Sequence, residues 1–406
     1  MLTRHACGLH DSVGTVPSPT VVIAGGGLAA VTLVQSLRQR DFDGELLVLS
    51  GDGALPYDRP PLSKDVLRGE RSAPLLVQPA DWADLHVDLR LGRNAVGLDP
   101  ERRAVLVDDG TEVAYDVLVV ATGATPRRLD LLDGPGVFVL RTQDDAAALG
   151  AAIRHSGHLV IVGGGFVGCE VAASARALGA RVVLIEQQEL PLTAALGPVV
   201  AAELTALHVA AGVDVRAGAT IHEVRGDGAD RVLLLSDGNV VPASVVLVGI
   251  GVTADTGWLA GSGIEIDNGV VCDQAGRASL PDLWAVGDVA SWWLPSLAAH
   301  RRIEHWTNAM EQAEVVARGL LGEDASHNPV PYVWTEQYGV TYQLAGLPAS
   351  GDEVTMVPGD QLVAVYGEAG RCTAVLVGGA PRMFNRLRKL LRANAFYDDV
   401  VASARL

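Results

Sequence analysis

The sequence is poor in lysine and cysteine, and it has no apolar run long enough to cross a membrane. Among its 31 basic residues only Lys64 and Lys389 are lysines, which suggests that a compact ammonium is needed at these positions. The four cysteines form no CxxC pair, which excludes a disulfide scaffold and favours a reducing cytosol. The uncharged apolar segment at residues 21–34 contains three consecutive glycines and is too short for a bilayer. We therefore expect a cytoplasmic protein that does not enter a membrane.

Patterns for binding metals and nucleic acids are also missing. No HExxH motif occurs, and the only close histidine pairs are at 155 with 158 and 300 with 305, so we expect no metal centre. The net charge of −17 disfavours a nucleic-acid partner. Hydrophobic residues make up 49% and charged residues 19%, which is a globular composition, and 406 residues correspond to two or three domains.

Two segments share a strand–glycine–helix pattern, residues 20–39 and residues 158–179. Each begins with an apolar run typical of a buried parallel strand and continues into an alanine-rich helical stretch. Glycines allow the tight turn and the close approach of a pyrophosphate to the helix N-terminus. The motifs are Gly25-x-Gly27-x-x-Ala30 and Gly163-x-Gly165-x-x-Gly168. Their duplication predicts two dinucleotide-binding domains.

An acidic residue after the second strand of each unit indicates which dinucleotide binds. Glu186 lies 21 residues after Gly165 at the end of an apolar strand, where a carboxylate accepts hydrogen bonds from a ribose diol. Gln187 and Gln188 follow it, and without an arginine to hold a 2′-phosphate, NADH is favoured over NADPH. In the first unit the corresponding acid is Asp52, at a looser spacing.

The rest of the chain contains shorter elements. Apolar runs at residues 117–120, 245–248 and 283–286 predict buried strands that end in turns, and residues 91–119 predict β-hairpins. After residue 328 the pattern changes to β-branched and aromatic segments, closed by a helix near residues 385–395.

Longer motifs lie between and after the two units. Residues 56–64 read PYDRPPLSK, residues 302–309 read RIEHWTNA, and residues 331–338 read PYVWTEQY. Together with Ala-Thr-Gly at 121–123 and Val-Gly-Asp at 286–288, they resemble the NADH-dependent ferredoxin reductases. That family includes putidaredoxin reductase, rubredoxin reductase and the reductases of aromatic-ring dioxygenases.

The resemblance implies a flavoprotein oxidoreductase, an FAD-dependent ferredoxin reductase that transfers electrons from NADH to a small iron–sulfur ferredoxin. Such an enzyme feeds a cytochrome P-450 monooxygenase or a ring-hydroxylating dioxygenase. The implied fold is α/β, with two Rossmann-like dinucleotide-binding domains, as in glutathione reductase, and a C-terminal α+β domain. We divide the chain into a flexible tail (1–17), an FAD-binding domain (18–127 and 248–328), an NAD-binding domain (128–247) and a C-terminal domain (329–406).

Matched motif by motif, the resemblance implies cofactor contacts in both units. For FAD they are Gly25, Gly27, Ala29, Asp52, Lys64, Val96, Arg141, Asp288 and Trp306. For NADH they are Gly163, Gly165, Gly168 and Glu186. The segment after Glu186 lacks the arginines that the family often has there, and the end of the chain matches loosely. Part of the nicotinamide nucleotide's contacts and the ferredoxin surface therefore stay open.

Lys64, Glu170 and Trp334 are candidates for the redox chemistry. By resemblance, Lys64 places a positive charge near flavin N5, Glu170 faces it across the flavin, and Trp334 lies near the flavin edge and the ferredoxin surface. Each has a plainer alternative: a loop lysine, an acid favoured by the dipole of a helix N-terminus, and a core tryptophan. We also expect Asp288 to open a helix as its N-cap.

Two other functions stay open. A flavin disulfide reductase or NADH oxidase of the same fold would use a redox cysteine beside the flavin, and residues 51–75 contain none. An FAD/NAD redox sensor would bind the cofactors without turnover. We expect a monomer or a weak homodimer.

The C-terminal region contains a basic segment without acidic residues between Glu368 and Asp398. Its apolar residues recur at helical spacing, which leaves much of the basic set on the outer face of a helix. That face either keeps the helix soluble or docks an acidic ferredoxin on a protein whose net charge would otherwise repel one. The basic residues are Arg382, Arg386, Arg388, Lys389 and Arg392.

Overall fold

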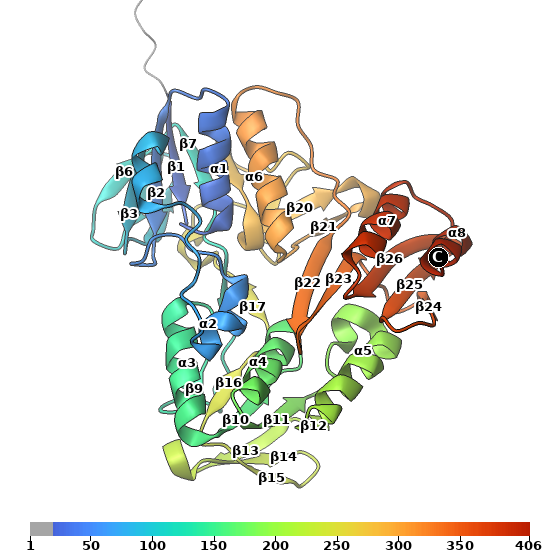
Figure 1. The fold of residues 1–406 in the computed structure, drawn as a ribbon. Helices are drawn as coiled ribbons and strands as arrows, with labels where there is room; N and C mark the ends of the chain where they lie inside the picture. The colour runs from blue at the N-terminus through green and yellow to red at the C-terminus, as the bar shows by residue number, and fades with distance from the viewer. Residues whose placement is uncertain (1–18) are drawn as a thin grey trace, which may run out of the picture.

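The computed structural model describes residues 19–406, whose elements form three neighbouring units (Figure 1). The flexible tail expected at 1–17 lies outside the described residues. Two units are built on parallel five-stranded sheets and the third on an antiparallel one. This is the α/β fold with two dinucleotide-binding units that the sequence predicts.

The first unit has a parallel sheet in the order β19–β7–β1–β2–β3. Its strands are Val- and Leu-rich and mostly buried, as strands covered on both faces are. Helices α1 (Leu28–Gln39) and α6 (Trp306–Leu320) pack against each other beside the sheet (Figure 1), although they lie far apart in the sequence. The strands are β1 (Thr20–Ala24), β2 (Glu45–Ser50), β3 (Val87–Leu91), β7 (Val117–Val120) and β19 (Leu283–Ala285). A small antiparallel sheet adjoins them, with β4 (Ala95–Asp99), β5 (Ala104–Val107) and β6 (Glu112–Ala114).

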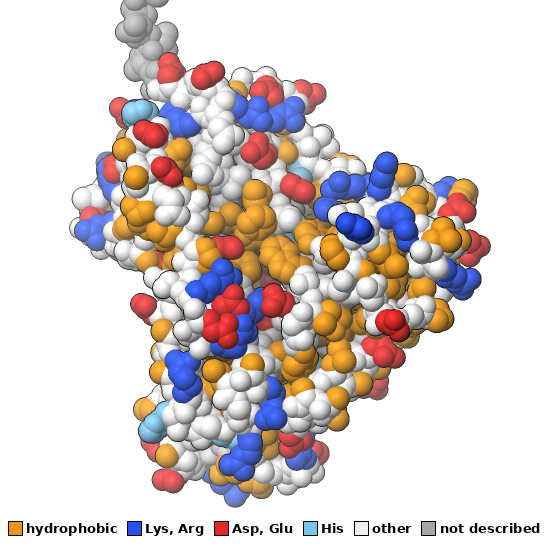
Figure 2. Space-filling model, viewed as in Figure 1, with side chains coloured by type: hydrophobic (Ala, Val, Ile, Leu, Met, Phe, Trp, Pro, Cys, Tyr) orange, Lys and Arg blue, Asp and Glu red, His pale blue; other side chains and the backbone are white. Residues whose placement is uncertain are grey.

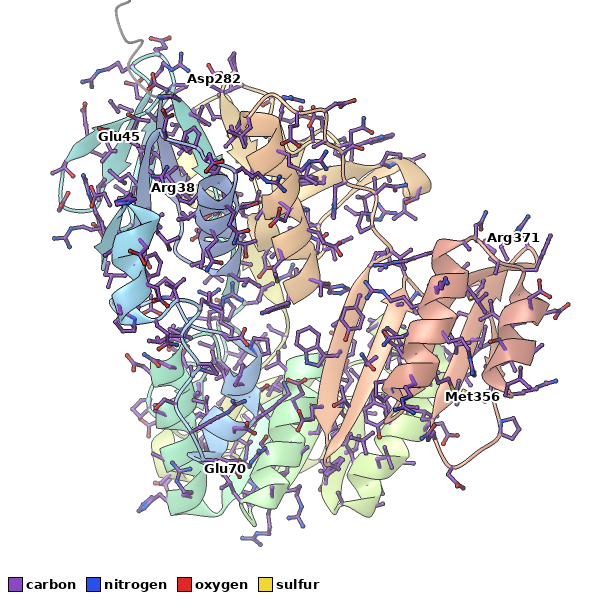
Figure 3. All side chains as sticks on the ribbon, turned by 45° about the horizontal axis from the view of Figure 1, so that its top comes forward. Arg38, Glu45, Glu70, Asp282, Met356 and Arg371 are labelled. Atoms are coloured by element: carbon purple, nitrogen blue, oxygen red, sulfur yellow. The ribbon has the colours of Figure 1, made fainter. Side chains whose placement is uncertain are left out.

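Arg38 fixes the end of α1 to the chain that enters β3. Its guanidinium donates to the carbonyl oxygens of Gly44 at 3.0 Å, Leu85 at 2.8 Å and His86 at 2.8 Å (Figure 3). Because carbonyl groups at a helix end and in a loop have no secondary-structure partner, one arginine satisfies several of them. These hydrogen bonds hold the C-terminal end of α1 against the loops that precede β2 and β3.

The second unit repeats the design with the sheet order β12–β11–β10–β16–β9, again parallel. Its strands are β9 (Val137–Phe138), β10 (His158–Val162), β11 (Arg181–Glu186), β12 (Val213–Ala217) and β16 (Val246–Val248). Its helices are α3 (Gln143–Ser156), α4 (Phe166–Ala177) and α5 (Thr193–Ala210). An antiparallel sheet closes its far end, with β13 (Ile221–Arg225), β14 (Val232–Leu235) and β15 (Val240–Pro242).

The chain passes between the first two units twice. The two crossings pair as antiparallel strands, β8 (Ala124–Pro126) with β17 (Val252–Ala254). After β17 the chain returns to the first unit, where β19 and α6 complete the sheet and its cover. The returning segment also forms a small sheet of β18 (Val270–Cys272), β20 (Ala290–Leu294) and β21 (Ala299–Arg301).

The third unit is an antiparallel sheet in the order β22–β23–β26–β25–β24. Helices α7 (Pro381–Arg392) and α8 (Tyr397–Ala404) cover one face, where Phe384 and Leu387 are fully buried. The other face packs against the second unit, since Tyr342 and Tyr366 share its core cluster. The strands are β22 (Tyr332–Gln337), β23 (Val340–Gly346), β24 (Glu353–Met356), β25 (Val363–Glu368) and β26 (Arg371–Gly378).

Two local expectations need correction. Asp288 does not open a helix: it lies in the three-residue turn Gly287–Val289, which leads directly into the buried strand β20. The next helix, α6, begins only at Trp306, because the apolar residues of β20 form a strand and β21 then pairs with it. The C-terminal helix begins earlier than expected, at Pro381, where proline's fixed φ suits the first helical position.

One described helix, α5, has the length and apolar composition of a membrane span, with a third of it buried. It packs against β12 and contributes Leu196, Val200 and Leu204 to the core of the second unit. Its backbone is interrupted at Gly197, which has a φ of +71°. These contacts suit a helix that covers a sheet.

Candidate functional site

A cleft of about 1120 Å³ lies where the three units meet. It exceeds the usual size of a small-molecule pocket, roughly 300–1,000 Å³. The sequence-predicted residues that line it are Gly25, Gly27, Ala29, Asp52, Lys64, Arg141, Gly165, Glu170, Asp288, Trp306 and Trp334. Four other candidates, Val96, Gly163, Gly168 and Glu186, do not line it.

The first glycine of each loop is required by a close backbone contact. Gly25 has a φ of +119°, and a Cβ there would collide with the carbonyl oxygen of Ala121. Gly163 has a φ of +108°, and its Cβ would collide with the carbonyl oxygen of Gly249. Gly168 has no room for a Cβ either, because the helix lies against the carbonyl oxygen of Gly163. The first glycines therefore let each loop pass close to the chain that follows a neighbouring strand, and Gly168 lets α4 lie against the end of β10.

The second glycine of each loop leaves space for a ligand. Gly27 and Gly165 are the N-caps of α1 and α4, and neither helix has a side-chain cap or an acid in its first turn. A Cβ at Gly165 would meet no atom within 4 Å, and one at Gly27 would meet only the Arg59 guanidinium, at 3.9 Å. The unpaired N–H groups therefore face open space, a cradle suited to a diphosphate. The fold and these residues fit two dinucleotides.

Arg59 is a cleft residue that the sequence reasoning missed, although it lies inside the 56–64 motif. It lies above the cradle at Gly27, and burial together with the neighbouring Arg141 lowers its pKa to about 10. Arg141 is paired with Asp288 at 3.3 Å. Two adjacent guanidinium groups repel each other unless an anion lies between them, so the pair suits a pyrophosphate.

Asp52 lines the cleft just after β2. Its carboxylate accepts hydrogen bonds from the Ala54 N–H at 3.0 Å and from the Tyr57 hydroxyl at 2.8 Å. Burial, and then the Asp52 carboxylate, raises the pKa of Tyr57 to about 12, so this phenol stays a donor. Val96 has a side chain that is 46% exposed, and its neighbour Ala95 lines the cleft instead.

Lys64 and Glu170 form a buried ion pair at the centre of the cleft. Lys64 Nζ lies 2.7 Å from Glu170 Oε2, and the two side chains are only 10% and 8% exposed. Lys64 follows a short 3₁₀ turn at Pro60–Ser63 and also donates to the Pro60 carbonyl at 3.0 Å. The Ser63 hydroxyl donates to the same Glu170 oxygen at 2.5 Å. The family resemblance predicts that the two residues face each other across the flavin. In the structure they instead contact each other directly, because the packing of the units brings them together.

The second carboxylate oxygen of Glu170 binds the third unit. It accepts from the Thr335 hydroxyl at 2.8 Å and from the Glu336 N–H at 3.2 Å, both in β22. One carboxylate from α4 therefore connects the 56–64 segment to the C-terminal sheet. Four donors around one buried carboxylate satisfy the charge that burial would otherwise penalise.

Aromatic side chains form the wall between the cleft and α7. Trp306 and Trp334 both line the cleft with ring centroids 5.9 Å apart, and Trp306 Nε1 donates to Asp58 at 2.8 Å. Tyr332 stacks on Trp334 at 5.9 Å, and the Arg388 guanidinium lies 4.7 Å above the Tyr332 ring. This aromatic series reaches from the cleft to the basic helix.

Glu186 lies at the second glycine loop. It accepts from the Gly164 N–H at 2.6 Å and from the Gln188 N–H at 2.8 Å. The half-buried carboxylate is thus oriented at the end of β11, beside the loop whose Gly165 faces the cleft. No described residue from 187 to 190 is basic, so this end of the strand offers no cation to a 2′-phosphate.

The described residues show neither a cysteine at the cleft nor a metal-binding group. Cys169, Cys272 and Cys372 are buried, and burial raises the pKa of each thiol. None of the three lines the cleft. Within residues 19–406 no group of three His, Cys, Asp or Glu side chains could hold a metal ion.

Comparison with known proteins places these observations in a family. Residues 19–313 match the family model for pyridine nucleotide-disulphide oxidoreductases, and residues 332–404 match the model named reductase C-terminal. Among curated proteins, the ferredoxin–NAD(+) reductase component of the p-cumate 2,3-dioxygenase system of Pseudomonas putida is 38% identical over 344 residues. The match covers 84% of each chain.

Solved structures agree with this assignment. The crystal structure of Fdr9 is 41% identical, has a TM-score of 0.86, and the match covers 93% of this chain and 96% of that one. The putidaredoxin reductase in the covalent putidaredoxin reductase–putidaredoxin complex is 29% identical, with a TM-score of 0.90. That match covers 96% of this chain and 99% of the other.

Proposed function

Since the chain belongs to the pyridine nucleotide-disulphide oxidoreductase family, we propose that it is the ferredoxin reductase of an oxygenase system. It is an FAD enzyme that passes electrons from NADH to a small iron–sulfur ferredoxin, which feeds a ring-hydroxylating dioxygenase or a cytochrome P-450 monooxygenase. The observation that carries this proposal is the cleft itself. Two helix N-termini without side-chain caps line it, together with a buried lysine–glutamate pair.

When bound, FAD would accept a hydride from NADH and release the two electrons one at a time. In the first unit, Gly25, Gly27 and Ala29 hold the diphosphate at the N-terminus of α1, with Arg59 and Arg141 above it. Asp52 would hold the adenosine end, Asp288 would bind the ribityl hydroxyls, and Trp306 would contact the flavin from the cleft wall. Val96 stays a prediction of the family resemblance. In the second unit, Gly163, Gly165 and Gly168 shape the loop for NADH.

Lys64 is the residue we assign to the reacting end. Its ammonium, held against Glu170, presents a positive charge to the place where negative charge develops on hydride arrival. Both side chains are largely buried, which strengthens that interaction. Glu170 balances the charge of Lys64. Its contacts with Ser63, Thr335 and the Glu336 N–H hold the carboxylate in place, and the carboxylate in turn orients the ammonium.

Electrons leave on the side of the third unit. Trp334 lies in the cleft wall. Figure 2 shows basic side chains gathered over α7, whose Arg388 lies over the Tyr332 ring next to Trp334. Arg382, Lys389 and Arg392 are exposed there, whereas Arg386 donates to the Ser403 carbonyl at 2.8 Å. A positive surface on a protein of net charge −17 suits an acidic ferredoxin.

The competing functions have less support. A disulfide reductase needs a cysteine at the cleft, and none of the described cysteines lines it. For the rest of the assignment, we propose a cytoplasmic enzyme, monomeric or weakly dimeric, that binds neither nucleic acid nor membrane.

The test is NADH-driven reduction of cytochrome c, titrated with [2Fe–2S], [3Fe–4S] and [4Fe–4S] ferredoxins and with rubredoxin. Continuous, ferredoxin-dependent turnover is expected from a yellow protein with one non-covalent FAD per chain. A redox sensor would instead bleach its flavin once and stop. A colourless, folded protein that does not take up FAD would refute the assignment.

A further inference from the structure

A second cavity, of about 430 Å³, adjoins Lys64. Among the described residues, Lys64 is the only one that lines both this cavity and the cofactor cleft. The other polar residues around it are Arg68, Ser174, Arg176, Glu336 and Tyr338. Lys64, one of only two lysines in the chain, therefore lies between the cofactor cleft and the second cavity. The cavity offers space for water beside its ammonium.

The walls of this cavity are fastened to the Lys64–Glu170 pair. On one side the Ser174 hydroxyl donates to the Ser63 carbonyl at 2.7 Å and accepts from Arg68 at 3.4 Å. These bonds fix α4 against the segment that carries Lys64.

Another part of the wall is fixed by a chain of hydrogen bonds that begins at the partly exposed Tyr338 and continues through buried side chains. The Tyr338 hydroxyl lies 2.7 Å from His208 Nδ1, and His208 Nε2 lies 2.9 Å from Gln337 Oε1. Gln337 donates to Thr335 at 3.2 Å, and Thr335 donates to Glu170. Burial lowers the pKa of His208, so its ring stays neutral within this chain. The cavity is therefore held in a fixed place beside the ion pair.

The reaction needs an exit for one proton. NADH gives up a hydride, which is two electrons and one proton, and each of two ferredoxins accepts one electron and no proton. The balance is NADH plus two oxidised ferredoxins giving NAD⁺, one H⁺ and two reduced ferredoxins. The remaining proton would start in the cleft beside Lys64, and bound nucleotide and ferredoxin would cover the open side of that cleft.

We propose that the second cavity is the outlet for this proton and that Lys64 passes it on. An N–H bond of the Lys64 ammonium breaks toward a water molecule in the cavity while the proton from the cleft side forms a new N–H bond. Glu170 compensates the charge throughout, and Glu336 provides a carboxylate in the cavity wall. This assignment rests on the ferredoxin reductase function, and it adds Glu336 and the cavity to the machinery.

The first test measures access to Lys64 without measuring turnover. The holoenzyme, with FAD and NAD⁺ bound, is treated with cyanate, a small reagent that carbamylates amines, and peptides are quantified by mass spectrometry. Ala177, an exposed residue at the end of α4 that lines the cavity, is changed to Phe to block the mouth. Ala151→Phe on α3, also exposed and away from both cavities, is the matched control. Lys389 is the internal reference.

We expect Lys64 of the parent holoenzyme to be carbamylated, and Ala177→Phe to slow this reaction at least about tenfold while Lys389 reacts at an unchanged rate. Ala177→Leu, a smaller plug, should give an intermediate rate. If Lys64 reacts only after FAD is removed, or equally fast in Ala177→Phe, access runs through the cofactor cleft and the proposal is wrong.

The second test follows the proton. A pH indicator in stopped flow reports proton release when the NADH-reduced enzyme is reoxidised by ferricyanide. Ala177→Phe should delay release at least about fivefold and leave hydride transfer at saturating NADH unchanged, and Ala151→Phe should match the parent. Equal release rates in both variants would overturn the outlet. Because ferricyanide and cyanate need no ferredoxin, this result is separate from the ferredoxin assay of the proposed function.

Discussion

The buried ion pair between Lys64 and Glu170 makes a quantitative prediction about stability. Glu170→Gln keeps the shape of the side chain but leaves the ammonium without its charge partner inside the protein. Breaking one partner of a buried pair costs about 3–5 kcal/mol of unfolding free energy. Lys64 keeps its contacts to the Pro60 carbonyl at 3.0 Å and the Ser63 hydroxyl at 3.2 Å, so we expect the lower end, about 3 kcal/mol.

The pair's contribution is separated by a double-mutant cycle in the holoenzyme. Lys64→Met should also destabilise the protein, because it leaves the Glu170 carboxylate uncompensated. The double variant removes both charges, so its loss should be smaller than the sum of the two single losses by about 2 kcal/mol. Glu112→Gln, which breaks the exposed pair with Arg102, is the control and should leave stability within error.

Urea unfolding followed by circular dichroism and flavin fluorescence measures each corner of the cycle. With a slope of about 3 kcal/mol per M, a loss of 3 kcal/mol lowers the midpoint by about 1 M. Additive losses at Lys64 and Glu170 would show that the two charges do not stabilise each other. If Glu170→Gln lowers the unfolding free energy no more than Glu112→Gln does, the contact between the three units depends on packing alone.

Three further predictions concern catalysis. The parent enzyme should favour NADH over NADPH in kcat/KM by at least about tenfold, roughly 1.4 kcal/mol, and Glu186→Arg should narrow or invert this ratio in steady-state assays, with Glu186→Gln as the charge-removal control. Equal use of both coenzymes by the parent would contradict the role of Glu186. Lys64→Ala should lower the limiting rate of flavin reduction in stopped flow more than it weakens NADH binding, and an unchanged limiting rate would make Lys64 an ordinary loop residue. Arg382→Glu with Lys389→Glu should raise the KM for ferredoxin at low salt and leave ferricyanide reduction intact. Arg386 is left unchanged because of its bond to Ser403, and an unaffected KM would place docking elsewhere.

The local sequence pattern predicts the structure correctly where a conformation depends only on neighbouring residues. The strands at 20–24 and 158–162, the glycine turns after them and the helices that follow are where the periodicity predicts them. The prediction for Asp288 failed because a residue's position after a strand does not determine what comes next. There the apolar residues of β20 form a strand, β21 pairs with it, and the helix begins later.

The site shows the same division. The sequence alone determined the two phosphate loops and the acids that follow them, since tight turns and helix N-termini are made from consecutive residues. Only the tertiary structure decided that Lys64, Glu170 and Thr335 share one hydrogen-bond network and that Lys64 separates two cavities. Those contacts join three units across more than a hundred residues of chain, and only the packing of the units brings them within hydrogen-bonding distance.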